Sequence, residues 1–254
     1  MPFMSQETQR IAKVLAAAGV ASRRAAEVLI QEGRVVLNGA VVTTPATFVG
    51  PNDQLSVDGQ NVALKRELPR FFLYHKPAGL VTTHKDPEGR PTVFASLPNH
   101  LPRVVSVGRL DQNSEGLLLL TTHGGLVRLL EHPSAGLGRV YRVRVYGPIP
   151  PRMLDQLRAG LEVEGVVYRG IDATILSRSG ANTWLEMTLK EGKNREIRRL
   201  MTHFGLRVSR LIRVSYGPFH LHDLKVGEVM EMPYPLVKQH LRRALALDVW
   251  ETLP

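Results

Sequence analysis

The 254-residue chain contains no cysteine. Disulfide bonds, thiolate zinc sites and cysteine nucleophiles are therefore excluded, and any chemistry must use other polar side chains. Long apolar runs are also lacking, because no window reaches the roughly 18 to 20 apolar residues that a membrane-spanning helix needs. The N-terminal residues carry charges throughout and contain no apolar signal core. We therefore expect a cytoplasmic protein that does not enter a membrane.

Acidic residues are scarce relative to basic ones. There are 33 Lys and Arg against 23 Asp and Glu, a net charge of +10. Such an excess favours a polyanionic partner, and either nucleic acid or an acidic membrane surface would satisfy it. The histidines form no metal-binding pattern, and no phosphate loop of the G-x-x-x-x-G-K-[ST] type is present.

The first sixty residues contain two helical patterns followed by short strands. Apolar residues recur at helical spacing in 10–19 and again in 22–33, and a glycine ends each pattern. Asn38-Gly39 then separates two apolar pairs, as in a type I′ hairpin turn, and residues 53–57 add a strand. Residues 1–7 are expected to be disordered, and 61–70 to form a linker.

The central stretch Gly108–Gly125 reads G-R-L-D-Q-N-S-E-G-L-L-L-L-T-T-H-G-G. Four consecutive leucines fit no amphipathic surface element and predict a strand that is buried on both faces. Asp111 then lies at the rim of a dry core, where a carboxylate stays ionised only if cations or donors face it. An isolated R-L-D tripeptide would more often cap a loop at a sheet edge.

Further strands and helices follow along the rest of the chain, and the expected fold class is α+β. Strands are expected at 71–74, 117–120, 139–146, 161–168, 172–176, 184–189, 208–213 and 226–232. Helices are expected at 125–131, 150–160, around 197–204 and within the 233–254 tail. Pro77 and Gly79 are expected to break the first of these strands directly after Tyr74.

A basic segment precedes the last strands. Between residues 187 and 213 only Glu191 and Glu196 oppose eight basic residues: Lys190, Lys193, Arg195, Arg198, Arg199, Arg207, Arg210 and Arg213. An apolar stripe that includes Ile197 and Leu200 runs through the same segment. We therefore expect a helix with one solvated basic side, which is the main surface for an anionic partner.

These motifs together resemble pseudouridine synthases of the RsuA and RluB type. The resemblance rests on G-R-L-D at 108–111 with the leucine strand, on E-G-K-N-R-E-I-R-R at 191–199, and on the alternating R-V-Y-R-V-R-V-Y at 139–146. It departs at Thr122-His123, where the family usually has Asn-Asp. It implies that Asp111 is the nucleophile and that Arg198 reaches its carboxylate.

The resemblance assigns two further residues to the substrate nucleotide. Tyr141 would stack against the target uracil, although Arg139 replaces the usual lysine before it. Arg109 would fill the space that the flipped base leaves. No metal and no organic cofactor is implied, because the reaction breaks one glycosidic bond and rejoins the same base.

The N-terminal segment resembles the αL RNA-binding domain first recognised in a small-subunit ribosomal protein. The resemblance predicts domains at 8–65 and 70–254, the second with a central, mostly antiparallel mixed sheet flanked by helices. RNA contacts are expected from both domains, at Lys13, Arg23, Arg24, Arg34, Asn38, Lys193, Arg195 and Arg199. Residues 1–65 hold six basic and five acidic side chains, so we expect a modest-affinity module.

The expected activity is isomerisation of a specific uridine in ribosomal RNA to pseudouridine. The segment D-P-E-G-R-P-T-V-F at 86–94 is most like the RluB branch, which modifies large-subunit rRNA. The expected partner is a structured rRNA stem-loop, free or in a ribosome assembly intermediate, and the protein is expected to be a monomer.

Two other functions are open at this point. A non-catalytic RNA-binding assembly factor could use the same two domains, but it would not need Asp111, Tyr141 and Arg198 in their motifs. A hydrolase could use Asp111 on a glycosidic bond, but it would usually need a second acid nearby, and none stands out.

Overall fold

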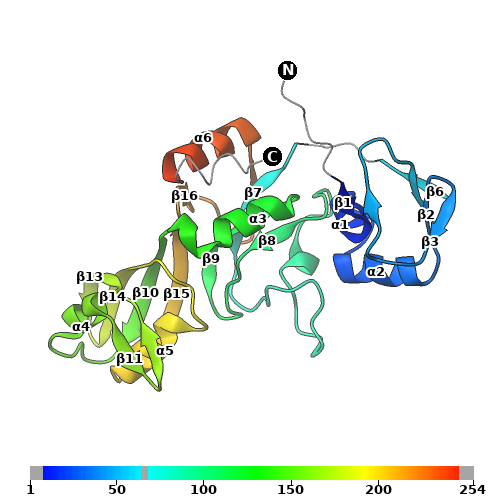
Figure 1. Cartoon of the computed structure of the whole chain (residues 1–254). Helices are drawn as coiled ribbons and strands as arrows, with labels where there is room; N and C mark the ends of the chain where they lie inside the picture. The colour runs from blue at the N-terminus through cyan, green and yellow to red at the C-terminus, as the bar shows by residue number, and fades with distance from the viewer. Residues whose placement is uncertain (1–7, 64–67, 246–254) are drawn as a thin grey trace. The chain divides into compact units, whose positions relative to one another are not determined.

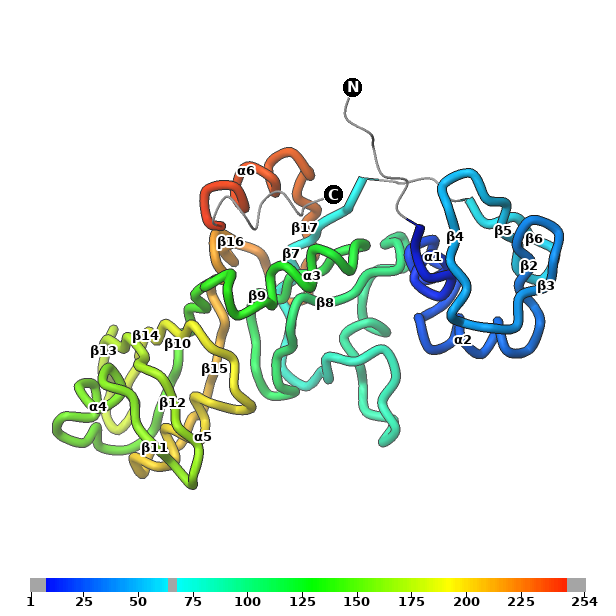
Figure 2. Tube along the Cα trace, viewed as in Figure 1, coloured from blue at the N-terminus to red at the C-terminus, as the bar shows by residue number. Residues whose placement is uncertain are grey.

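The computed structural model describes residues 8–63 and 68–245 (Figures 1 and 2). Three expectations lie outside the described residues. They concern residues 1–7, residues 64–67 of the predicted linker with Lys65, and the tail beyond 245. The chain divides into two compact units, Met1–Leu68 and Pro69–Pro254. No helix in the described part of the chain is both long and apolar enough to cross a membrane.

The first unit packs two helices against short antiparallel strands. Its helices are α1 (Ile11–Ala17) and α2 (Arg23–Gln31), and Ser22 caps α2 by accepting a hydrogen bond from the Ala25 amide. Its strands are β1 (Gln9–Arg10), β2 (Val35–Leu37), β3 (Ala40–Val42), β4 (Phe48–Val49), β5 (Leu55–Val57) and β6 (Gln60–Val62). The sheet order is β3-β2-β5-β6, and β1 pairs with β4. Asn38 and Gly39 both have positive φ, as the predicted hairpin turn requires.

The second unit is built on a nine-stranded mixed sheet in the order β13-β14-β10-β15-β9-β7-β17, with β8 and β16 attached to β9 and β15. These strands are β7 (Phe71–Lys76), β8 (Val105–Val107), β9 (Glu115–Thr121), β10 (Arg139–Tyr146), β13 (Asp172–Ser179), β14 (Asn182–Leu189), β15 (Arg207–Tyr216), β16 (Phe219–His220) and β17 (Val229–Met232). Among the described pairings of this sheet, β9 with β15 alone is parallel. The predicted α+β class and mostly antiparallel mixed sheet are confirmed.

Helices cover the two halves of this sheet separately (Figure 1), and each pair of helices packs on a core of its own. A third core lies on the other face of β7 and β9, under segment 79–93. The helices α3 (Gly124–Glu131) and α6 (Tyr234–Ala244) pack on β7 and β9. The helices α4 (Met153–Ala159) and α5 (Glu196–His203) pack on β10, β14 and the start of β15. Leu117 to Leu120 are each 0% exposed, so the leucine strand is buried on both faces as predicted.

The two halves meet at a short junction between β9 and β15. Only two residue pairs are in register there, Glu115 with Ile212 and Gly116 with Arg213. Gly116 has φ +102°, and a Cβ on it would lie 2.3 Å from the Arg213 carbonyl oxygen. Glycine is therefore required at this position by both its backbone conformation and the close approach of β15.

Two predicted strands differ from the structure. β7 continues to Lys76, past the expected break after Tyr74, because His75 and Lys76 still pair with Leu117 and Gly116. Residues 161–168 form a hairpin of β11 (Leu161–Val163) and β12 (Val166–Tyr168), and not one strand. Glu164 and Gly165 between them both have positive φ, which reverses the chain.

Candidate active site

Asp111 begins a tight turn that leads directly into β9. The Ser114 amide donates to the Asp111 carbonyl at 3.0 Å, which closes the turn, and the Asp111 side chain is 30% exposed. Leu110 before it is buried, and the buried leucines of β9 begin at Leu117. The carboxylate is therefore held at the edge of a dry core while it remains open to solvent.

A buried lysine supports this turn from below. Lys76, at the end of β7, is 0% exposed, and its Nζ donates to the carbonyls of Pro77, Gln112 and Ser114 at 2.9, 3.2 and 2.8 Å. Burial lowers the pKa of Lys76 to about 8, although the negative charges of Asp111 and Glu115 oppose that shift. The ammonium thus fixes the backbone that carries Asp111 and adds positive charge near its carboxylate.

Two guanidinium groups face the Asp111 carboxylate from the other half of the sheet. Arg195 Nη1 lies 3.7 Å and Arg198 Nε lies 4.0 Å from Asp111 Oδ2. Arg198 also donates to the Asn113 carbonyl at 2.8 Å, so it contacts both the turn and its carboxylate. Burial lowers the pKa of Arg198, Arg195 adds to the effect, and Asp111 opposes it. An arginine remains charged under such a shift, so two cations face the single Asp111 carboxylate.

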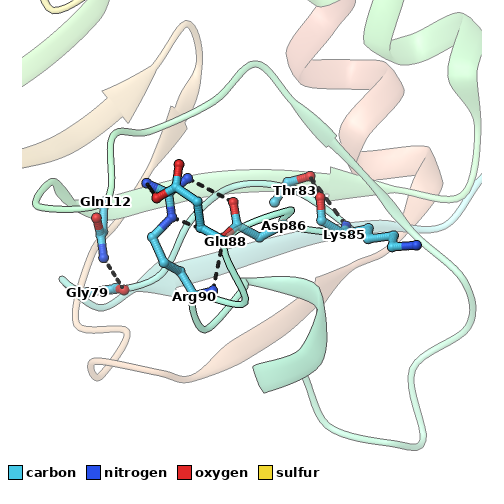
Figure 3. Close-up of polar contacts among 7 residues, drawn as sticks. All are labelled: Gly79, Thr83, Lys85, Asp86, Glu88, Arg90 and Gln112. Carbon is cyan, nitrogen blue, oxygen red and sulfur yellow. Dashed lines mark hydrogen bonds and ion pairs between the residues drawn. The ribbon is translucent and has the colours of Figure 1, made fainter.

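The segment 79–93 covers the turn from a third side (Figure 3). The Gly79 amide donates to the Gln112 carbonyl at 2.7 Å, and the Thr82 hydroxyl donates to the Leu110 carbonyl at 2.8 Å. Within the segment, Arg90 binds Asp86 through two side-chain hydrogen bonds and its backbone amide. These bonds lower the pKa of the Asp86 carboxyl to about 2, and its side chain is 3% exposed. The predicted loop is therefore internally braced.

Tyr141 lies in the same row of the sheet as Gly116, two residues after the turn. Strand register places Lys76, Gly116, Arg213, Tyr141 and Met187 side by side across five strands. At about 4.8 Å per strand, the Tyr141 backbone lies roughly 10 Å from that of Gly116. Tyr141 is half-buried and packs against both the α5 core and the core under segment 79–93. Its ring therefore lies where the two halves of the sheet meet.

Comparison with known protein families identifies the family of the second unit. Residues 70–203, more than half of the chain, match the family described as RNA pseudouridylate synthase. The chain belongs to this family of enzymes. Residues 9–55 match the S4 domain, so the synthase carries an N-terminal S4 domain before its catalytic fold.

Relatives of the synthase cover nearly its whole length. A Rickettsia bellii protein described as an uncharacterized RNA pseudouridine synthase is 50% identical over 91% of this chain and 99% of its own. The ribosomal large subunit pseudouridine synthase B of Haemophilus influenzae is 42% identical over 85% of this chain and 62% of its own. A crystal structure of a pseudouridylate synthase has the same fold, with a TM-score of 0.65 at 22% identity, over 91% of this chain and 99% of that one.

The other predicted site residues of the synthase are of two kinds. Five are exposed and have no acidic partner among the described side chains: Lys13, Arg23, Arg24, Arg109 and Arg199. Three are already bonded within the protein. Arg34 binds Asp58 and Glu32, Asn38 binds Asp53 and the Gln54 amide, and Lys193 binds Glu191 and the Val167 carbonyl. An RNA contact from these three would compete with those bonds.

Sequence reasoning missed two residues that shape the site. Lys76 was placed in a strand-breaking loop, although a lysine that ends a run of buried residues could have indicated an internal cation. Glu196 was counted as part of a solvated basic helix, but it is 3% exposed and one of its oxygens accepts from the Lys193 amide. Its carboxylate closes the chain back onto the turn before α5, because the Lys193 amide lies three residues earlier.

Proposed function

We propose that this synthase converts a specific uridine of large-subunit ribosomal RNA to pseudouridine, with Asp111 as its nucleophile. One observation carries the proposal: Asp111 is partly exposed at the edge of an apolar core and is flanked by Arg195 and Arg198 at 3.7 and 4.0 Å. No second carboxylate of the described residues forms an ion pair with these two arginines. A single acid suits an isomerisation better than a hydrolysis that needs an acid and a base.

The reaction exchanges one bond for another within a single nucleotide. The bond from the ribose anomeric carbon to uracil N1 breaks, and a bond to uracil C5 forms. The C5 hydrogen leaves as a proton, and N1 takes up a proton, so the composition of the nucleotide does not change. The base must first leave its stack, at a cost of roughly a few kcal/mol. Asp111 can then attack the anomeric carbon, attack the uracil ring, or remove a sugar proton. In each of these routes Asp111 acts as a carboxylate, and Arg195 and Arg198 lie beside it.

Tyr141 and Arg109 are proposed to handle the flipped nucleotide. A tyrosine face contributes roughly 1 to 3 kcal/mol of stacking with a base, and the hydroxyl of Tyr141 can move a proton during rearomatisation. Arg109 is exposed two residues before the nucleophile, which places it to enter the space that the base leaves. Arg198 is proposed to hold the Asp111 carboxylate in place, 4.0 Å from its Nε.

The substrate assignment is supported by the relatives. Proteins 41 to 42% identical to this chain are named for the large ribosomal subunit. We propose that the domain at 8–65 binds a structured rRNA stem-loop while the domain at 70–254 modifies it. Its exposed Lys13, Arg23 and Arg24 are the contacts, together with Lys193, Arg195 and Arg199 of the catalytic domain. The proposed form is a cytoplasmic monomer acting on free rRNA or on an assembly intermediate.

The test is Asp111→Asn, which removes the charge and keeps the shape. Large-subunit rRNA transcribed in vitro with uridine tritiated at C5 should release tritium with the wild-type protein and none with the variant. RNA affinity should stay within a few fold, because a single carboxylate among several cations is not a phosphate contact.

The outcomes separate the candidate functions. Turnover by Asp111→Asn would exclude Asp111 as the nucleophile. Free uracil in place of pseudouridine would identify a hydrolase. Tight binding without tritium release by the wild-type protein would favour a binding factor over a synthase for that RNA.

A further inference from the structure

A basic groove runs along α5 beside the proposed nucleophile. Its volume is about 470 Å³, within the usual range for ligand sites, and its lining includes Arg195, Arg198, Thr202 and the segment 205–208. Three of its seven lining residues are arginines, and no acidic residue of the described chain lines it. The groove therefore suits an anionic ligand.

The groove adjoins the Asp111 carboxylate. Arg195 and Arg198 line the groove, and the same two side chains contact Asp111 Oδ2 at 3.7 and 4.0 Å. Arg198 is fixed in place by hydrogen bonds to the carbonyls of Asn113 and Val208. A nucleotide whose ribose lies at Asp111 would thus have its neighbouring backbone next to the groove.

Positive charge in the groove exceeds what Asp111 balances. One carboxylate faces Arg195 and Arg198, and Arg207 at the start of β15 has no acidic partner among the described residues. The Arg207 guanidinium lies 5.3 Å from the centre of the Tyr146 ring, which holds it without neutralising it. Three guanidinium groups against one carboxylate leave two uncompensated positive charges, which matches a phosphodiester better than a neutral ligand.

Arg195 can reach a ligand as well as Asp111. It lies directly before α5, and its side chain is 52% exposed. Its guanidinium is therefore open to an anion on the groove side while it lies 3.7 Å from the carboxylate.

We propose that this groove binds a phosphodiester of the RNA strand that flanks the target uridine, with Arg195 and Arg207 as the phosphate contacts. Arg198 orients the groove wall and Asp111 together. The inference rests on the proposed function, because it takes RNA as the ligand. It adds a site for the phosphodiester of the RNA strand, which fixes the orientation of the flipped nucleotide relative to α5.

The experiment compares Arg207→Gln with Arg178→Gln. Arg178 is an equally exposed arginine on β13, the strand at the far edge of the sheet, and has no ion pair among the described residues. Binding of in vitro transcribed large-subunit rRNA is measured as a function of salt concentration. Arg207→Gln should weaken binding roughly three- to tenfold at low salt and reduce the slope of log K against log salt by about 0.7 to 0.9. It should also raise KM more than it lowers kcat.

The control variant should match the wild type in affinity, slope and turnover. Arg195→Gln combined with Arg207→Gln should lower the slope by about twice the single effect. An unchanged slope in both Arg207 variants, with an intact thermal transition, would overturn the proposal. The salt slope needs no turnover, so a synthase inactive on this transcript would count against the proposed substrate without deciding the groove.

Discussion

Asp111 shows how far single residues could be assigned from sequence. The pattern around it predicted a carboxylate at the rim of a buried strand, and the family resemblance implied Arg198 as its cation, which lies 4.0 Å from it. The closer position of Arg195, at 3.7 Å, was not predicted. A pattern of polar and apolar residues does not show which arginine of a basic segment lies nearest a carboxylate that is distant in sequence.

Glu196 is the residue whose ionisation most affects this region. Burial raises the pKa of its carboxyl to about 7, and the nearby charge of Glu191 adds to the effect. The pKa of this carboxyl in the folded state is thus above its value of 4.5 in the unfolded state. The folded state therefore holds more protons than the unfolded state between these two values, so stability falls as pH rises from about 4.5 to about 7.

Replacing Glu196 with glutamine should remove this pH dependence. The glutamine oxygen can still accept from the Lys193 amide, and its amide group can donate to Glu191. We expect Glu196→Gln to raise stability at pH 8 by about 1 to 3 kcal/mol and to change it little at pH 5. Thermal denaturation at both pH values measures the difference. An equal gain at both pH values would show that the folded state does not raise the pKa of Glu196.

At the scale of elements, periodicity located most helices and strands. The helical patterns in 10–19, 22–33 and around 197–204 and the alternation in 139–146 all correspond to elements of the expected type. The row that joins Lys76, Gly116, Arg213 and Tyr141 could not be predicted. It depends on the spatial order of strands that are distant in sequence, and no local pattern encodes that order.

The β9–β15 junction makes a prediction of its own. Gly116→Ala would place a Cβ 2.3 Å from the Arg213 carbonyl oxygen at φ +102°, so β15 must move away. We expect a loss of roughly 3 kcal/mol or more, which lowers the Tm by about 6 to 12 °C in a chain of this size. Gly192→Ala is the matched control, since no heavy atom lies within 4 Å of its added Cβ. Equal melting of both variants would contradict the close approach at the junction.

At the scale of the whole molecule, each compact unit has its own hydrophobic core. The first unit buries Ile11, Leu15 and Ile30 completely, and its core contains no residue of the second. A segment with its own hydrophobic core can fold independently. The boundary between the proposed domains at 8–65 and 70–254 stays a prediction, which a truncated chain can test.

A fragment that begins at Pro69 should therefore fold and keep a cooperative thermal transition. Its affinity for in vitro transcribed large-subunit rRNA should fall roughly tenfold, because one of two linked binding modules is lost. Calorimetry and filter binding test the two parts. An aggregated fragment would argue against the boundary, and undiminished affinity would show that the N-terminal unit does not bind this RNA.

Because β9 and β15 pair through only two residue pairs, this enzyme can lose activity without unfolding. Asp111 is supplied by one half of the sheet, whereas Arg195 and Arg198 come from the other. A slight separation of the halves would pull the carboxylate from its counterions while each core stayed intact. Substitutions near this contact should therefore abolish turnover at temperatures where the protein is still fully folded.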